Sequence, residues 1–434
     1  MEYVVLGIFS LFLFICLFFD ITILYALLGG LLLFTLHGIR QGFSLREIVR
    51  FAYSGIRTVR HILLTFILIG IMTALWREAG TIPTIVCHST SWISPPAFLL
   101  MTFLLNCLIS VLTGTAFGTA ATMGVICAAM GASLGVSPFL TGGAILSGVY
   151  FGDRCSPIST SALLVSALTG TNIYTNIKGM IRSAVVPFAM TCAVYAAVGY
   201  ITTVHNDIPN LSAVFATDFD LSWLTVLPAV VLLALALLRV NVKLAMTASI
   251  SAAIPICLFV QHTPMNALPS LIVWGYTSQD PEIASMLSGG GIVSMLTVAA
   301  IVCISSAYSG IFRQTGLLTG IKTAVSRLAY RTTPFASALV TSVMTGMIAC
   351  NQTLTIMLTD QLCRDTDRDS SRFAITLEDT AVVIAPLVPW SIAAAVPLTS
   401  VGAPPDSVLF ACFLYLLPIW QCITASRTRS HTPS

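Results

Sequence analysis

The chain has 434 residues, of which 56% are hydrophobic and only 9% are charged, and its formal net charge is +3. Soluble domains carry about 25% charged residues, so this composition excludes an ordinary soluble fold and requires that most of the outer surface face lipid. The small net charge, without a long basic run, gives no indication of a nucleic-acid partner. The 12 cysteines contain no CxxC pair and indicate small buried residues, not disulfides or metal ligands.

Apolar segments begin at the first residues of the chain. Residues 4–19 and 21–36 meet at Asp20 and predict a helical hairpin. A helix that crosses a hydrocarbon core of about 30 Å needs about 20 apolar residues. Eight further candidates follow in chain order: Ile62–Trp76, Ala97–Thr113, Ser183–Val204, Trp223–Leu238, Leu244–Val260, Ile292–Phe312, Phe335–Ala349 and Val408–Ile423.

Three more apolar stretches, residues 115–130, 139–168 and 373–398, are interrupted by Gly, Pro, Thr or Ser. In lipid every backbone amide must be satisfied, so broken helices persist only where they line a cavity or a binding site. The predicted fold class is therefore all-α. We expect a polytopic transmembrane helical bundle of about 10–12 spans, some of them broken or re-entrant.

Basic residues predict the orientation of the bundle. One connection contains Arg40, Arg46, Arg50, Arg57 and Arg60 with only Glu47 against them, and another contains Arg313, Lys322, Arg327 and Arg331 with no acid. Because cytoplasmic loops carry the excess of Lys and Arg, both connections and the N-terminus are expected inside.

Three pairs of segments match in the same order along the chain. They are Ala74–Gly80 with Gly310–Gly316, Thr113-Gly114 with Thr345-Gly346, and Asp153 before Ser156-Pro157 with Asp379 before Ala385-Pro386. The offsets are 313 − 77 = 236, 345 − 113 = 232 and 379 − 153 = 226, which indicates an internal repeat.

The predicted orientation places Arg77 outside and Arg313 inside, so the repeats should be inverted, with a parallel repeat or chance as the alternatives. The predicted units are an N-terminal hairpin and basic loop (1–60), a first repeat (61–205), connecting helices (206–290), a second repeat (291–426) and a polar tail (427–434).

Polar islands interrupt both predicted repeats. The first contains Thr113, Thr115, Thr119 and Thr122, and the second contains Asn351, Gln352, Thr353 and Thr355. Unwound segments of this kind can turn carbonyl and hydroxyl oxygens toward a bare cation. The alternative is that these hydroxyls only bond back to helical carbonyls.

Asp153 lies in a stretch that is otherwise apolar or hydroxylic apart from Arg154. An ionisable group within the membrane is costly and usually functional, and a carboxylate there can hold either Na⁺ or a proton. The alternative is a structural ion pair with Arg154 or another arginine. Glu378 and Asp379 are the counterparts in the second half, where their closeness to a charged loop also allows a solvated helix end.

At these residues the chain resembles the NhaC-type Na⁺/H⁺ antiporters of the ion-transporter superfamily. The resemblance rests on three segments, Thr113–Thr119, Tyr150–Ser159 and Leu377–Trp390. It implies two inverted repeats, each with a re-entrant hairpin and a broken helix, and it assigns Asp153, Ser156 and the threonine island to the first half-site.

Two positions depart from the family pattern. The family motif GD-x-x-SP-x-S is usually continued by Asp, where this chain has Thr160, and a common His is replaced by Asn176. The loss of a carboxylate removes one ion ligand or proton carrier. Some relatives carry organic anions or amino acids, so the resemblance also allows a substrate of that kind.

The function expected from these features is secondary active transport in the bacterial inner membrane, with Na⁺ or Li⁺ and protons competing at a midplane site. The alternative is a Na⁺- or H⁺-coupled carrier of a small organic acid or amino acid. No nucleotide, metal or nucleophile motif indicates an enzyme, and no cofactor is expected beyond the transported ions. Expected partners are membrane lipid, a small cation, protons and, in the alternative, an organic solute, with a homodimer as one candidate assembly.

The predicted binding residues are Thr113, Thr115, Thr119, Thr122, Asp153, Ser156, Ser159, Asn172, Asn351, Gln352, Thr353, Thr355, Glu378 and Asp379, with Asp153, Thr115 and Asn351 as candidate Na⁺ ligands.

Overall fold

The computed structural model describes residues 5, 7–9, 11–12, 15–16, 23–89, 95–157, 159–203, 215–216, 218–238, 240–278, 284, 287–315, 333–367 and 369–429. Over these residues the regular structure is helical, apart from an isolated bridge between Tyr276 and Gly289. The predicted all-α class is confirmed. The second basic connection lies largely outside the described residues, as does most of the first apolar segment.

The helices of the first half are α2 (Ile23–Arg40), α3 (Leu45–Thr58), α4 (Arg60–Glu78), α5 (Thr81–Ser89), α6 (Phe98–Thr113), α7 (Ala116–Thr119), a π-helical turn (Ala120–Gly124), α8 (Val125–Ser133), α9 (Pro138–Cys155), α10 (Thr160–Thr169) and α11 (Ile173–Thr203). Connecting helices are α13 (Leu227–Leu237), α14 (Val242–Phe259) and α15 (Leu268–Trp274). The second half contains α17 (Gly291–Ser294), α18 (Leu296–Thr315), α20 (Pro334–Ala349), α21 (Gln352–Cys363), α22 (Ser370–Asp379), α23 (Ala381–Ile384), α24 (Ile392–Ser400) and α25 (Cys412–Arg429).

Several helices are suited to a membrane. Within the described residues, four are long and apolar enough to span it: Pro95–Thr113, Ala116–Ser133, Ile173–Thr202 and Val242–Phe259. A fifth candidate, Ser370–Leu387 with Ile392–Ser400, is bent by 59° at its break, as the interruptions in its sequence predicted. Six shorter apolar helices accompany them. The expected bundle of apolar helices is confirmed. The expected number of about 10–12 spans stays a prediction.

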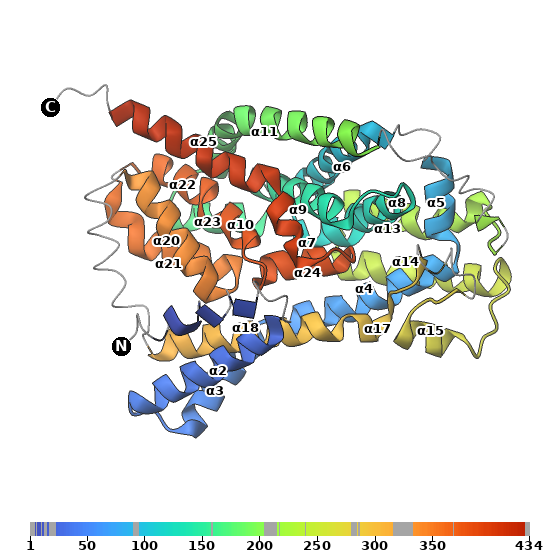
Figure 1. Cartoon of the computed structure of the whole chain (residues 1–434), viewed down its shortest axis with the longest axis horizontal. Coiled ribbons are helices and arrows are strands. Elements are labelled where there is room, and N and C mark those ends of the chain that lie inside the picture. Colours follow the sequence, from blue (N-terminus) through green and yellow to red (C-terminus); the bar gives the residue numbers. More distant parts are fainter. Residues whose placement is uncertain are drawn as a thin grey trace.

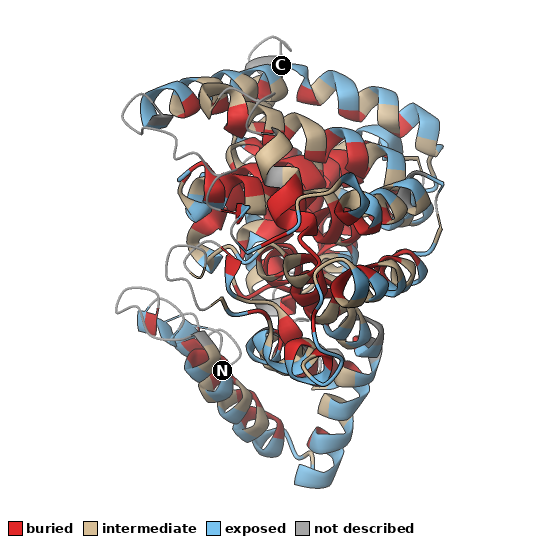
Figure 2. Ribbon diagram, turned by 90° about the vertical axis from the view of Figure 1, so that its right-hand side faces the viewer, coloured by how far each residue is buried: buried red, intermediate tan, exposed pale blue. Residues whose placement is uncertain are grey.

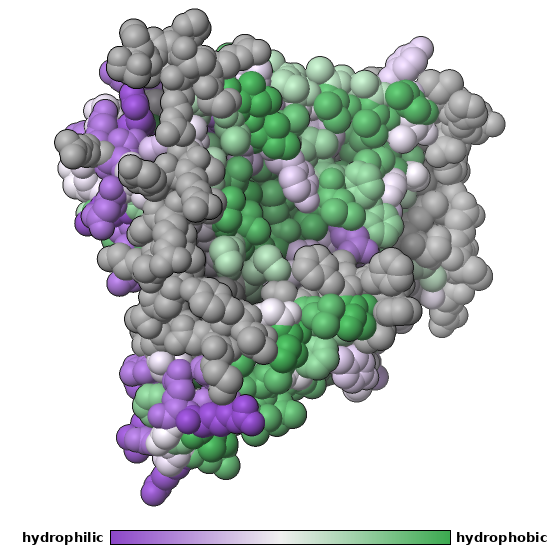
Figure 3. Space-filling model, turned by 60° about the vertical axis from the view of Figure 1, so that its left-hand side comes forward, coloured by the Kyte–Doolittle hydropathy of each residue, from purple (hydrophilic) through white to green (hydrophobic). Residues whose placement is uncertain are grey.

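The helices form layers around a buried centre. In Figure 1, α11 and α25 cover one side, α9, α10, α23 and α24 lie in the middle, and α4, α17 and α18 run along the opposite side. Buried residues gather in the middle of the body, while the α2–α3 hairpin projects from it (Figures 1 and 2). Figure 3 shows hydrophobic residues across the middle of one face, with hydrophilic residues at its edges, as expected of a surface that contacts lipid.

The first basic connection is a helix, where the sequence predicted a loop. Ser44 and Glu47 form a capping box at the start of α3, and the hydrogen bonds from the backbone and hydroxyl of Ser44 lower the pKa of Glu47. The helix then crosses α18 at very close range, because a Cβ on Gly55 would lie 2.0 Å from the carbonyl oxygen of Ser306. Small residues at such a crossing let two helices approach so closely that their backbones touch.

The two halves repeat one local structure. Gly114 ends α6 in the left-handed region (φ 66°, ψ 28°) and Thr115 then caps α7 in an extended conformation (φ −148°, ψ 119°). Cys350 and Asn351 do the same between α20 and α21 (φ 52°, ψ 19° and φ −151°, ψ 130°). Both pairs are offset by 236 residues (350 − 114 and 351 − 115). The predicted match of Thr113 with Thr345 is therefore wrong by four residues, about one helical turn.

A second pair of breaks also recurs. Ser159 caps α10 (φ −67°, ψ 138°) two residues after Pro157, and Ser391 caps α24 (φ −72°, ψ 144°) two residues after Pro389. The equivalent of Pro157 is thus Pro389, not Pro386 as the sequence match proposed. Asp153 lies six residues before its break (159 − 153), whereas Asp379 lies twelve before the other (391 − 379). The two acids are not positional equivalents, and the inverted orientation of the repeats stays a prediction.

Candidate functional site

Asp153 lies buried near the end of α9, with 4% of its surface exposed. Its Oδ1 accepts a hydrogen bond from the Ser159 hydroxyl at 2.8 Å, and its Oδ2 accepts one from the Ser161 hydroxyl at 2.7 Å. The backbone of Ala116, at the start of α7, also faces this carboxylate. The helix is interrupted between α9 and α10, and the first turn of α10 folds back against Asp153 in the last turn of α9. Neutral hydroxyls hold the carboxylate, and within the described residues no basic side chain forms an ion pair with it.

Arg154 pairs with Asp379, not with Asp153. Its guanidinium donates to Asp379 Oδ1, to the Ser183 hydroxyl at 2.8 Å and to the Met180 carbonyl at 3.1 Å. Consecutive residues on an α-helix point about 100° apart, so α9 directs Asp153 toward α10 and Arg154 toward α11 and α22. The alternative of an ion pair between Asp153 and Arg154 is therefore wrong.

Glu378 is fully buried beside this pair, at 0% exposure. Within the described residues neither of its carboxylate oxygens has a hydrogen-bond partner. The charges of Arg154, Asp153 and Asp379 all act on it. The alternative of a solvated helix end for Glu378 and Asp379 is therefore wrong, because α22 ends inside the protein and not at the charged loop that precedes it.

The cluster of Asp153, Glu378, Asp379 and Arg154, here called the acidic cluster, is unbalanced in charge. Its three carboxyls and one guanidinium carry −3 + 1 = −2 when all are ionised. Burying an uncompensated charge is strongly unfavourable, so protons or bound cations must make up the difference. In the described part of the chain no three acidic, His or Cys side chains converge as metal ligands. The described carboxyls thus form no shared metal site of this kind, and their excess negative charge is left to be neutralised in another way.

The threonine island folds into helix. The hydroxyls of Thr113, Thr119 and Thr122 donate to the carbonyls of Ile109, Thr115 and Gly118 at 2.9, 2.9 and 2.8 Å. Thr115 Oγ1 accepts from the Gly118 amide as the cap of α7. In this conformation the hydroxyls bond back to their own helix, as the alternative proposed. The π-helical turn Ala120–Gly124 follows directly, and such turns are frequent at functional sites.

The second polar island behaves similarly. Asn351 caps α21 through the Leu354 amide, Thr355 donates to the Asn351 carbonyl at 2.8 Å, and Gln352 donates to the Val382 carbonyl at 3.1 Å. Thr353 is exposed. No hydrogen bond within the described residues joins Thr115 or Asn351 to Asp153, so the proposed three-residue Na⁺ site stays a prediction.

Four other positions singled out in the sequence lie around the acidic cluster and not in it. Ser156 ties the end of α9 to α6 by donating to the Val111 carbonyl at 2.8 Å. Asn172 is exposed and accepts from the Tyr174 amide at the start of α11. Thr160, at the family Asp position, is exposed, and Asn176 is buried and donates to the Thr171 hydroxyl.

Three residues of the site were not predicted: Ser161, Ser183 and Tyr150. Tyr150, one turn before Asp153 on α9, donates to the Ala393 carbonyl at 2.7 Å and so joins α9 to the first turn of α24. The backbone amide of Ile392 in the same turn donates to the Cys350 carbonyl at the other break. The start of α24 thus contacts both half-sites. Only Ser161 had a sequence signal, as a hydroxyl residue two positions after Ser159 at the break.

Comparison with known proteins agrees with this architecture. The Na⁺/H⁺ antiporter family matches residues 1–166 and 148–425. The malate-2H⁺/Na⁺-lactate antiporter of Bacillus subtilis (strain 168) is 27% identical over 400 residues, which are 89% of this chain and 86% of the relative. The Na⁺/H⁺ antiporter NhaC of Alkalihalophilus pseudofirmus is 27% identical over 81% of this chain and 78% of its own. The arginine/ornithine antiporter ArcD of Halobacterium salinarum is also 27% identical, over 81% of this chain and 75% of its own. The chain is therefore a multi-pass membrane protein that belongs to the Na⁺/H⁺ antiporter family.

Proposed function

We propose that this protein exchanges Na⁺ for protons across the bacterial inner membrane at the acidic cluster. The observation that carries the proposal is the charge imbalance: within the described residues Arg154 forms its ion pair with Asp379, and neither Asp153 nor Glu378, both buried, forms an ion pair. A buried carboxyl in that situation is neutralised by either a proton or a bound cation. Because both ions neutralise the same group, each must displace the other.

The two unpaired acids have different roles in this proposal. Asp153 is held by two hydroxyls, whose oxygens can turn toward a Na⁺ ion that replaces the proton. Glu378 has both oxygens free within the described residues and so can take up a proton without breaking a contact. The Arg154–Asp379 pair holds α9 against α22 and keeps the two acids near one another. Movement of one half against the other would then expose them to either side.

The test is proton transport in everted vesicles, followed with a pH-sensitive dye on addition of Na⁺, Li⁺ or K⁺. Asp153→Asn and Glu378→Gln should each abolish or severely slow the Na⁺-driven signal at unchanged expression, and Asp153→Glu should retain more activity than Asp153→Asn. Asp406→Asn is the matched control, since it removes a carboxylate outside the cluster. Wild-type activity in both Asp153→Asn and Glu378→Gln would refute the proposal.

A Na⁺- or H⁺-coupled carrier of an organic acid or amino acid is the second candidate. The names of two relatives point to organic solutes, malate and lactate in one and arginine and ornithine in the other. That support is weaker than the family match, and a separate feature of this chain bears on it: an arginine-lined cavity away from the acidic cluster.

A further inference from the structure

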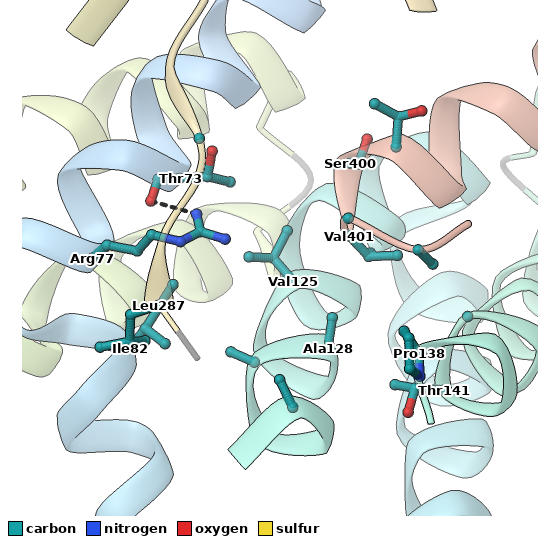
Figure 4. Close-up of a pocket in the computed structure, with 18 of the residues that line it drawn as sticks. Thr73, Arg77, Ile82, Val125, Ala128, Pro138, Thr141, Leu287, Ser400 and Val401 are labelled. Carbon is teal, nitrogen blue, oxygen red and sulfur yellow. Dashed lines mark hydrogen bonds between the residues drawn. The ribbon is translucent and has the colours of Figure 1, made fainter. Parts of the chain in front are cut away.

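A cavity of about 740 Å³ lies between α4, α8, the start of α9, the end of α24 and the 287–295 segment. Its size is in the range of small-molecule sites. One wall is built from small apolar residues of α8, among them Val125 and Ala128, and another from Thr141 and Ser400 (Figure 4). None of the predicted binding residues lines it.

Arg77 projects into this cavity from the last turn of α4 (Figure 4). One terminal nitrogen donates to the Thr73 carbonyl at 2.9 Å, and Nε has no hydrogen-bond partner among the described residues. Among the described residues no carboxylate lies within ion-pair distance of the guanidinium, and no acidic side chain lines the cavity. A guanidinium has five donors in a planar fork that matches a carboxylate. A single bond to a helical carbonyl leaves most of this fork unused.

Three of the hydroxyls that line the cavity can accept hydrogen bonds from a ligand. The hydroxyls of Thr141, Ser294 and Ser400 line the cavity and donate to the carbonyls of Ser137, Gly291 and Val396 at 3.2, 2.8 and 2.7 Å. Because each hydroxyl proton is already committed to its helix, the oxygens are left with lone pairs for a ligand. A solute that fits should therefore carry a donor as well as a negative charge.

We infer that this cavity binds a small hydroxycarboxylate anion, with Arg77 on the carboxylate and the cavity hydroxyls accepting from the solute's hydroxyl. A free metal cation does not suit a site in which Arg77 is the one charged side chain among the described lining residues. An amino acid suits it less well, because its ammonium group would find no carboxylate among those residues. The anion would bring the guanidinium a counter-charge that the described residues around it do not supply.

The inference rests on the second form of the proposed function, a cation-coupled carrier of an organic acid, but the two sites are physically separate. Thr141 lines the cavity and Asp153 lies twelve residues further along α9 (153 − 141), a rise of about 18 Å. Helix α24 also connects them, since Ser400 lines the cavity and Ala393 contacts Tyr150 beside the acidic cluster. Binding at each site can therefore be measured and abolished on its own.

The experiment measures thermal unfolding of the purified full-length protein with L-lactate, propionate or the neutral analogue lactamide. The acids are added as choline salts so that Na⁺ does not vary, with choline chloride as the ionic-strength control. Lactate should raise the unfolding temperature, propionate should do so less, and lactamide should not. Arg77→Gln should weaken the apparent affinity for lactate about ten- to a hundredfold, because it removes hydrogen bonds to a charged group. Arg77→Lys should retain part of it, and Arg182→Gln, which removes an exposed arginine on α11, should change nothing.

The Na⁺ arm separates this inference from the proposed function. Na⁺ as its chloride should stabilise wild type and Arg77→Gln, but not Asp153→Asn, whereas lactate should still stabilise Asp153→Asn. A purely structural role of Arg77, as a cap of α4, predicts a lower unfolding temperature in Arg77→Gln with an undiminished lactate shift. That result, or equal shifts with lactate and lactamide, overturns the inference. If wild type is stabilised by lactate but not by Na⁺, only the proposed Na⁺ exchange is overturned.

Discussion

The Arg154–Asp379 pair predicts that the acids of the cluster differ sharply in what they contribute to stability. Asp379→Asn removes the charge that pairs with the buried guanidinium and leaves it only neutral acceptors: the new amide oxygen, the Ser183 hydroxyl, the Met180 carbonyl and the Cys155 sulfur. An uncompensated buried charge of this kind destabilises by about 3–5 kcal/mol. Asp153→Asn leaves the ion pair intact and weakens two hydroxyl bonds to a charged acceptor, a loss of about 1–3 kcal/mol.

The assay is thermal unfolding of the purified variants in one detergent, together with expression level. Asp379→Asn should unfold at a clearly lower temperature than Asp153→Asn. The double variant Arg154→Met with Asp379→Leu removes both charges, and replacement of a buried pair by apolar residues of similar size is often neutral. It should therefore recover most of the lost stability. Glu378→Gln is the control, since it neutralises a neighbouring acid that makes no ion pair within the described residues.

Equal destabilisation by Asp379→Asn and Asp153→Asn would refute this reasoning, as would a double variant no more stable than Asp379→Asn. The first result would mean that another acid compensates Arg154. The second would mean that Asp379 acts through shape or water-mediated contacts and not through its charge.

Three further predictions follow from the same contacts. The apparent Na⁺ affinity should weaken by up to about tenfold for each unit by which the pH falls below the pKa of the shared acid, and a flat profile in the dye assay would exclude competition. Replacing both Ser159 and Ser161 by Ala should weaken Na⁺ activation while the maximal rate changes less, because these hydroxyls contact only Asp153 among the acids of the cluster. Gly55→Ala should destabilise the protein, since its Cβ would lie 2.0 Å from the Ser306 carbonyl oxygen, whereas Gly7→Ala, whose Cβ would meet no atom of the described residues within 4 Å, should not. Equal unfolding temperatures would show that α3 shifts without loss of stability.

Features that depend on local sequence were predictable. Continuous apolar runs gave helices, and runs interrupted by Gly, Pro or hydroxyl residues gave broken ones, because the interruption acts on the backbone where it occurs. The helix α3 was missed although its start is written as Ser-Leu-Arg-Glu, a capping-box pattern. The prediction of a loop rested on the arginines of this segment alone and did not use the capping-box pattern.

Features that depend on helix rotation and packing were not predictable. Arg154 and Asp379 are 225 residues apart, and nothing in the spacing of either segment tells which faces of α9 and α22 meet. The internal repeat was predicted from matching residue types. The positions of the backbone breaks, however, decide which residues of the two halves are equivalent. Cys350 takes a left-handed conformation where the first half has Gly114, so the equivalence cannot be seen from residue types.

The separation of the cavity from the acidic cluster limits how the two sites can communicate. If the two charges are as far apart as Thr141 and Asp153 are along α9, about 18 Å, they interact by about 0.9 kcal/mol at an effective dielectric constant of about 20, or about fivefold in affinity, before screening by salt. Linkage requires that any tightening of Na⁺ binding by the anion equal the tightening of anion binding by Na⁺. A mutual effect well above fivefold must then be carried by movement of the elements that reach both sites. These are α9 and α24, and the Tyr150–Ala393 hydrogen bond joins them where they pass the acidic cluster. The coupling of a solute at Arg77 to an ion at Asp153 would thus depend on whether these two helices move as one body.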